Sequence, residues 1–143
     1  MFENSHMMKT NYLLERSLDV ESLRRKVIAN NIANVDVPHF KRSEVNFESQ
    51  LKRVIEQNEH LAQNEYPAVL TDKRHIPFTE RLDVHGVGPR VNLDYSTSYR
   101  NDGNNVDIER EMVDASKNLM RYNASIAALS HNFKVMKMVM RQV

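Results

Sequence analysis

The chain has 143 residues, a length typical of one domain. Its 20 basic and 19 acidic residues leave a net charge of only +1, which argues against a general polyanion-binding surface. The absence of cysteine excludes disulfide scaffolds, cysteine-ligated zinc and thiol nucleophiles. Only three glycines and four prolines are present, which favours long helices over a sheet of many strands.

We expect a mainly α fold in a single domain over residues 1–143. Long N- and C-terminal helices should pair as a coiled-coil-like hairpin, with a shorter middle helix and an irregular central segment between them. The expected segments are an N-terminal helix within 1–36, a turn and short helix over 37–62, an irregular centre over 63–104 and a C-terminal helix over 105–143.

The N-terminal helix is predicted over about residues 8–35. Apolar residues recur there at helical spacing, as Leu13, Val20, Leu23 and Val27. Asn30 and Asn34 continue the same line as polar residues, which lowers stability but fixes register in paired helices. Because Pro38 disfavours helix at the residue before it, the helix should stop near Asp36.

A shorter amphipathic helix is predicted over about residues 44–62, capped by Ser43 or Asn46. Its apolar positions are Phe47, Leu51, Val54, Ile55 and Leu61. Residues 63–104 show no sustained period, although the stretch 92–99 could alternate as a strand.

The C-terminal helix carries the strongest pattern in the chain. Ten residues are spaced alternately by four and three, a heptad seam that predicts a helix of about 50 Å starting at a cap on Asn104 or Asn105. The seam residues are Ile108, Met112, Ala115, Leu119, Tyr122, Ile126, Leu129, Phe133, Met136 and Met140.

The residues that flank this seam are small, polar and uncharged, where a two-stranded zipper usually has Glu and Lys. They are Ser116, Asn118, Asn123, Ser125, Ser130 and Asn132. A helix that is apolar or small nearly all round is normally buried, and one chain of this size cannot cover it on every side. We therefore expect other subunits to cover the helix.

The sequence offers no recognisable catalytic chemistry. No His pair has the spacing of a zinc protease motif, the glycines of 85–90 lack a following P-loop Lys, and no Ser has triad partners in a known motif. No apolar run is long enough to span a membrane, and residues 1–9 do not resemble a secretory signal peptide. We expect no enzyme activity, no cofactor, no metal and no nucleic-acid partner.

Residues 29–42 contain the most specific stretch, Ala-Asn-Asn-Ile-Ala-Asn-Val-Asp-Val-Pro-His-Phe-Lys-Arg. It resembles the N-terminal signature of flagellar axial proteins, the rod, hook and hook-associated group. In this signature, Thr and Gly stand where the chain has Val37 and His39, and a Pro before the Gly position, here Pro38, is typical of proximal rod proteins. The matching residues are Asn31, Ile32, Ala33, Asn34, Phe40 and Lys41; with Asn30 and Pro38 they form the candidate assembly signature.

Two further stretches narrow the resemblance. Residues 102–112 are similar to the segment that opens the C-terminal helix of proximal rod proteins. Thr71 with His75 and Ile76 resembles a short block in the middle of one proximal rod protein and favours it over its neighbour in the rod, which stays an alternative. A soluble coiled-coil adaptor is a further alternative, although it would expose charged residues beside its seam.

The resemblance implies a structural subunit that assembles through its terminal helices into the torque-transmitting rod of the flagellar basal body. It implies a periplasmic rod location reached through the flagellar type III export apparatus without a cleaved signal peptide. The implied partners are copies of the chain, other rod proteins, the membrane-ring adaptor and the export apparatus. No cofactor is implied.

The three asparagines near the end of the first helix carry a finer expectation. The last carbonyls of a helix lack partners within it, and Asn side chains can bind such groups. We expect Asn31 and Asn34 to join these carbonyls to a neighbouring chain at the turn carrying Phe40, and Asn30 to lie on the seam of the helix pair.

Overall fold

The computed structural model describes residues 6–63, 71–72, 74–75, 82–96 and 98–141. In chain order its elements are α1 (His6–Ala33), β1 (Ser43–Asn46), α2 (Glu48–Gln63), the 3₁₀ turn η1 (Val84–Gly86), β2 (Arg90–Leu93) and α3 (Ile108–Arg141). The predicted mainly helical fold with long terminal helices is therefore confirmed. The chain separates into two compact units, residues 46–90 and the remainder.

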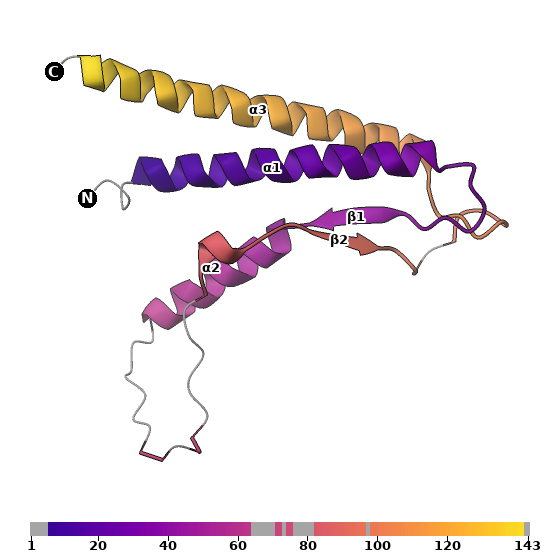
Figure 1. Cartoon of the computed structure of the whole chain (residues 1–143), viewed down its shortest axis with the longest axis horizontal. Helices are drawn as coiled ribbons and strands as arrows, with labels where there is room; N and C mark the ends of the chain where they lie inside the picture. Colours follow the sequence, from indigo (N-terminus) through magenta and orange to yellow (C-terminus); the bar gives the residue numbers. More distant parts are fainter. Residues whose placement is uncertain (1–5, 64–70, 73, 76–81, 97, 142–143) are drawn as a thin grey trace. The chain divides into compact units, whose positions relative to one another are not determined.

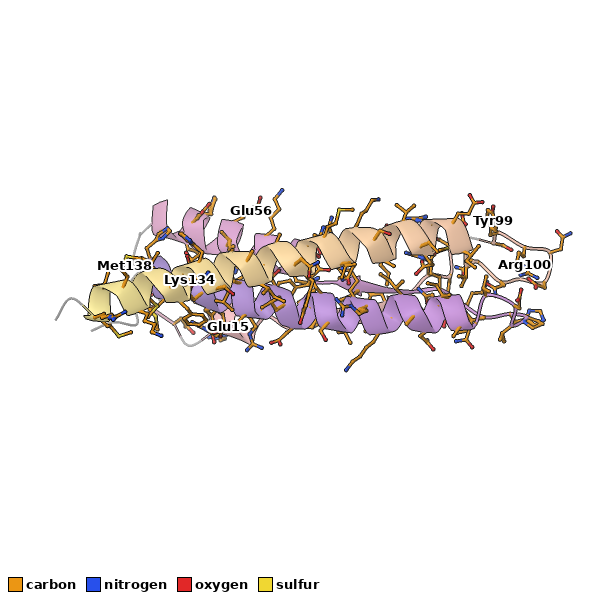
Figure 2. All side chains as sticks on the ribbon, turned by 90° about the horizontal axis from the view of Figure 1, so that it is seen from above. Glu15, Glu56, Tyr99, Arg100, Lys134 and Met138 are labelled. Carbon is orange, nitrogen blue, oxygen red and sulfur yellow. The ribbon has the colours of Figure 1, made fainter. Side chains whose placement is uncertain are left out.

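The larger unit, 1–45 with 91–143, is built around α1 and α3. These helices lie antiparallel and side by side along their length (Figure 1). Figure 2 shows Tyr99 and Arg100 beyond the end of the pair where α3 begins, and Lys134 and Met138 toward the other end. Among the described residues of this unit, the buried apolar side chains are few: Val20, Ile28, Val45 and Val106.

The N-terminal end of α3 is capped by Asp107. Its Oδ1 accepts hydrogen bonds from the backbone N–H groups of Glu109 at 2.9 Å and Arg110 at 3.4 Å. Glu109 and Glu111 add negative charge to the first turn, which complements the helix dipole. The expected cap on Asn104 or Asn105 is therefore wrong, because both side chains bind loop backbone instead.

The short strands β1 and β2 form a two-stranded antiparallel sheet (Figure 1). β1 was not expected, and β2 covers 90–93 rather than the alternating stretch 92–99. Beyond β2, the backbone N–H of Asp94 donates to the carbonyl of Arg42 at 2.9 Å, which holds the segment after β2 beside the segment before β1.

The smaller unit, 46–90, contains α2 and η1. Phe47 and Val54 are its buried apolar residues, while the side chain of Asn46 accepts a hydrogen bond from the Ser49 hydroxyl at 2.5 Å. Asn58 holds Leu82 by two hydrogen bonds, donating to its carbonyl at 2.8 Å and accepting from its N–H at 3.0 Å. Of the sequence block at Thr71, His75 and Ile76, Ile76 lies outside the described residues.

Candidate assembly site

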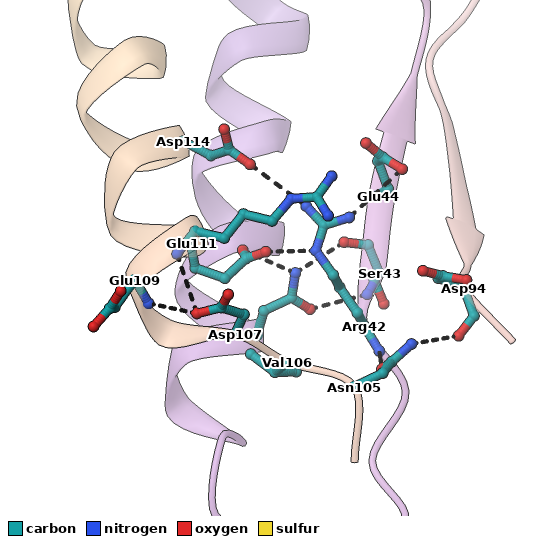
Figure 3. A network of polar contacts seen from close by, with 12 residues as sticks. Arg42, Ser43, Glu44, Asp94, Asn105, Val106, Asp107, Glu109, Glu111 and Asp114 are labelled. Atoms are coloured by element: carbon teal, nitrogen blue, oxygen red, sulfur yellow. Dashed lines mark hydrogen bonds and ion pairs between the residues drawn. The ribbon is translucent and has the colours of Figure 1, made fainter. Parts of the chain in front are cut away.

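A buried polar cluster joins the two terminal arms of the chain where α3 begins. Its members are Asn31, Arg42, Asn105 and Glu111, which we call the clasp. Figure 3 labels Arg42, Asn105 and Glu111. The Arg42 guanidinium donates through Nε to Glu111 at 2.6 Å, and Asn31 Nδ2 donates to the other Glu111 oxygen at 3.1 Å. Asn105 accepts from the backbone N–H of Arg42 at 2.7 Å. The clasp therefore fixes residue 42 against α3.

Asn31 uses every polar atom of its side chain inside the chain. Its Nδ2 also donates to the Ser43 carbonyl at 2.9 Å, and its Oδ1 accepts from the Ser43 N–H at 3.0 Å. The residue is fully buried. The expectation that Asn31 reaches a neighbouring chain is therefore wrong, since the neighbours that it binds belong to its own chain.

The Arg42–Glu111 ion pair is shielded from solvent. The exposed fraction of the Arg42 side chain is 8%, and that of the Glu111 side chain is 0%. Burial lowers the pKa of Arg42, but the hydrogen bond and charge of Glu111, with smaller contributions from Glu44 and Asp114, leave the pKa above its ordinary value. Removing one member of such a pair leaves the other charge buried, which costs far more than losing a surface salt bridge.

The C-terminal end of α1 is closed by Asn104. Its Nδ2 donates to three carbonyls, those of Asn34 at 3.1 Å and of Val35 and Val37 at 2.9 Å. The carbonyls beyond the helix end do bind an Asn side chain, as the sequence argument required, but the Asn comes from the same chain. Asn34 itself bonds back to Asn30, at 2.7 Å to its carbonyl and 3.1 Å to its side chain.

Residues 34–41, which we call the signature turn, are held against residues 100–105, which we call the partner loop. The N–H of His39 donates to the Asp102 carbonyl at 3.1 Å, and Lys41 Nζ donates to the Gly103 carbonyl at 2.8 Å. Arg100 bonds the Val35 carbonyl and the Asp36 carboxylate, both at 3.1 Å. The turn therefore depends on a segment more than sixty residues later in the sequence.

His39 adopts a φ of +60°, a left-handed conformation that favours glycine. The signature that residues 29–42 resemble has Gly at this position, and a left-handed backbone is the conformation that glycine adopts most readily. Opposite it, Gly103 has a φ of +79°, and a Cβ there would lie 3.0 Å from His39 Nδ1. The positive φ favours glycine at 103, and a Cβ there would press against the His39 side chain.

The remaining signature residues occupy the end of α1 and the turn. Ile32 and Phe40 are half-buried, whereas Ala33 and Pro38 are exposed. Asn30 is also exposed, so the expectation that it lies on the seam of the helix pair is wrong. The seam position belongs to the next residue, Asn31.

The ten seam residues of α3 divide into two groups. Half-buried are Ala115, Tyr122, Leu129 and Met136, and exposed are Ile108, Met112, Leu119, Ile126, Phe133 and Met140. Five of the exposed residues recur at intervals of seven and form a line that we call the outer stripe. The exposed fractions of its members are as follows: Met112 61%, Leu119 51%, Ile126 41%, Phe133 50% and Met140 68%.

The positions of α3 that face α1 include polar residues that the sequence placed beside the seam. Asn118 Nδ2 donates to the Glu21 carbonyl at 2.9 Å, and Asn132 Nδ2 donates to Asn11 Oδ1 at 2.7 Å. Sequence reasoning missed this role, although Asn118 and Asn132 stand at heptad spacing from Glu111. This heptad spacing was the feature of the sequence that could have indicated that Glu111, Asn118 and Asn132 face α1.

Within the described part of the chain, no group of His, Asp or Glu side chains could hold a metal ion. None of the described helices is long and apolar enough to cross a membrane.

Comparison with known proteins identifies the family. The model of the family described as flagella basal body rod protein matches residues 18–41, the second half of α1 and the signature turn. A flagellar basal body rod protein FlgB from Borrelia hermsii is 46% identical over 129 residues, which is 90% of this chain and 93% of that protein. The chain belongs to the FlgB family of flagellar basal body rod proteins.

More distant FlgB proteins match over nearly the same length. The protein from Borreliella burgdorferi is 36% identical over 88% of this chain and 91% of its own length, and that from Bacillus subtilis is 32% identical over 89% of both. The family that residues 29–42 and 102–112 resemble is thus confirmed. FlgC, the neighbouring rod protein that the sequence left open, is not favoured.

Proposed function

We propose that this chain is a structural subunit of the proximal rod of the bacterial flagellum. It would assemble with copies of itself and with other rod proteins into the shaft that transmits torque. We further propose that it contacts the membrane-ring adaptor, and that it reaches the periplasm through the flagellar type III export apparatus without a cleaved signal peptide. Family membership supports the location in the basal body.

The outer stripe is the observation that carries this proposal. Five large apolar side chains stay 41–68% exposed along one line of α3. Exposed apolar surface that runs continuously along an element marks an interaction site. Neighbouring subunits that cover this line would remove it from water.

Covering the stripe contributes favourable free energy to assembly. Full burial of a large apolar side chain stabilises by about 1.5–3 kcal/mol, so burying the exposed half of five gives roughly 4–7 kcal/mol per subunit. We propose that a different surface of the neighbouring subunit covers the stripe, which makes the contact heterologous. Heterologous contacts whose rotation does not close build an open helical assembly such as a rod.

The test places a charge on the stripe. Ile126→Asp, expressed in a strain lacking the native protein, should abolish rod assembly because assembly would bury an unpaired carboxylate. Asn123→Asp is the matched control, since it adds the same charge at an exposed polar position of the same helix. Swimming in soft agar and the recovery of rods in purified basal bodies are the measurements.

Motile cells with intact rods in the Ile126→Asp strain would refute the role of the stripe. Recovery of the unaltered chain only in the soluble fraction, never with basal bodies, would refute the rod assignment and favour a soluble adaptor. Equal loss of assembly in both variants would show that any added charge on α3 is harmful, which would remove the stripe as the cause.

A further inference from the structure

The interior of the α1–α3 pair is mainly polar. The buried residues of α1 are Asn11, Val20, Glu21, Ile28 and Asn31, and those of α3 are Glu111 and Asn118. Two apolar residues therefore share the buried interface with five polar ones, while the outer stripe faces water. This distribution reverses the usual arrangement of a helix pair.

These buried polar residues, together with the half-buried Asn132, form three layers along the pair. In the outer layer Asn132 donates to Asn11 at 2.7 Å, and Asn11 Nδ2 lies 3.8 Å from Met136 Sδ. The middle layer joins Asn118 to both the backbone carbonyl and the carboxylate of Glu21.

The same Glu21 carboxylate binds Arg24 at 2.5 Å. The inner layer is the Asn31–Glu111 contact of the clasp, 3.1 Å long. Among the described residues, no buried side-chain nitrogen or oxygen lacks a hydrogen-bond partner.

These partners exist in only one alignment of the helices. Sliding α3 by seven residues in one direction would bring Glu111 to Glu21, two carboxylates in a buried site. Sliding it in the other direction would bring Val139 to Asn11 and carry Glu111 away from Arg42. Each slide leaves buried polar groups unpaired, at about 1–3 kcal/mol for each group.

The apolar residues cannot make this distinction. The half-buried apolar seam positions of α3 recur every seven residues as Ala115, Tyr122, Leu129 and Met136. A slide by one heptad changes residue size at the Ala115 end, but elsewhere exchanges large apolar residues for one another, which costs less than leaving buried polar groups unpaired. Alignment therefore has to come from the polar layers.

We propose that the three polar layers are a register key, which admits one antiparallel alignment of α1 on α3 and excludes pairings slipped along the helix axis. Buried polar residues have this role in coiled coils, where they fix register and partner number at a cost in stability. The key leaves the outer stripe free and holds it in a defined position. The inference rests on contacts within one chain and does not depend on the proposed function.

The test uses the cysteine-free chain, in which engineered thiols react without competition. The Arg25 guanidinium lies 4.7 Å from the ring centre of Tyr122, so Arg25→Cys with Tyr122→Cys reports the observed register. Arg25→Cys with Leu129→Cys reports a slip of one heptad, about 10 Å along the helix. A short bismaleimide traps each pair in the purified full-length chain, and gel electrophoresis separates intramolecular from intermolecular products.

Both reporters are compared in the parent and in a variant with Leu at positions 11, 21, 118 and 132, which removes the outer and middle layers. We expect the parent to cross-link only through the 25–122 pair. The four-leucine variant should stay helical by circular dichroism, with slipped products raised about tenfold or more. The control Ser116→Leu with Asn123→Leu adds apolar side chains at exposed positions of α3 and should behave as the parent does.

Three results would overturn the proposal. An unchanged product pattern in the four-leucine variant would mean that the outer and middle layers take no part in setting the register. Slipped products or no 25–122 product in the parent would mean that the layers do not fix it. Loss of helical signal in the four-leucine variant would mean that the layers hold the helices together rather than align them.

Discussion

Replacing Glu111 with Gln tests the clasp with a change of only one functional group. The parent side chain accepts from Arg42 at 2.6 Å and from Asn31 at 3.1 Å and has no exposed surface. Gln keeps one acceptor for Arg42, but its NH₂ group meets the Asn31 donor, and the buried guanidinium loses its nearest negative charge. Glu44 and Asp114 remain 3.6 Å away and compensate only in part.

The expected cost follows from these contacts. Breaking a buried ion pair costs about 3–5 kcal/mol, and the two remaining carboxylates and the retained acceptor reduce this to about 3 kcal/mol. Small domains have about 5–15 kcal/mol of stability in total. A chain that buries so few apolar residues belongs near the lower end, so the urea midpoint should fall by a third to a half.

Urea unfolding followed by circular dichroism measures this change, with Glu44→Gln as the matched control. Glu44 contacts the same guanidinium, but its side chain is 63% exposed, so its loss should cost about 0.5 kcal/mol or less. The pKa of Arg42 is raised in the folded chain. Its contribution to the free energy of unfolding is therefore complete below the pKa of the unfolded state and is lost only as pH rises through the pKa of the folded state. The loss of stability in Glu111→Gln, relative to the parent chain, should therefore be the same at about pH 7 and about pH 10. Equal midpoints for the two variants would refute the reasoning.

Three further substitutions test the contact between the signature turn and the partner loop, each by urea unfolding. Asn104→Ala removes the donor to three carbonyls and the acceptor for Val106 N–H, and should lower the free energy of unfolding by about 2–3 kcal/mol. The control Asn101→Ala, at an exposed turn position, should leave stability unchanged. Unchanged stability in Asn104→Ala would contradict the role of Asn104 in closing the end of α1. His39→Gly removes the strain of a left-handed backbone at a non-glycine residue and should stabilise the chain by about 0.5–1 kcal/mol. A loss of stability would show that contacts of the His39 side chain outweigh the backbone strain. Gly103→Ala should lower the free energy of unfolding by about 1–2 kcal/mol, and by less in a chain that also carries His39→Gly. Strictly additive effects of the two changes would argue against the 3.0 Å contact between a Cβ at 103 and His39 Nδ1.

The helices were predictable from the sequence because their signals are local. The heptad spacing in residues 108–140 and the helix-disfavouring Pro38 placed α3 and the end of α1 within a few residues of their observed bounds. β1 could not be predicted in the same way. It has four residues, and its pairing depends on a partner more than forty residues later in the chain.

The interior of the helix pair could not be predicted from apolar periodicity. That method assumes that apolar residues face the partner helix, whereas here Glu111 and Asn118 face α1 and Leu119 and Ile126 face water. The asparagines near the end of α1 show the same limit. Sequence reasoning identified the carbonyls that needed a donor, but Asn104, which supplies it, is some seventy residues away.

The central claim is that neighbouring subunits cover the outer stripe in an assembled rod. Cryo-electron microscopy of purified basal bodies, with this chain fitted to the density, measures it directly. The account predicts that Leu119, Ile126 and Phe133 lie within about 4 Å of apolar side chains from another subunit. Density that places these three residues against solvent, with the opposite face of α3 in contact with the neighbours, would contradict it.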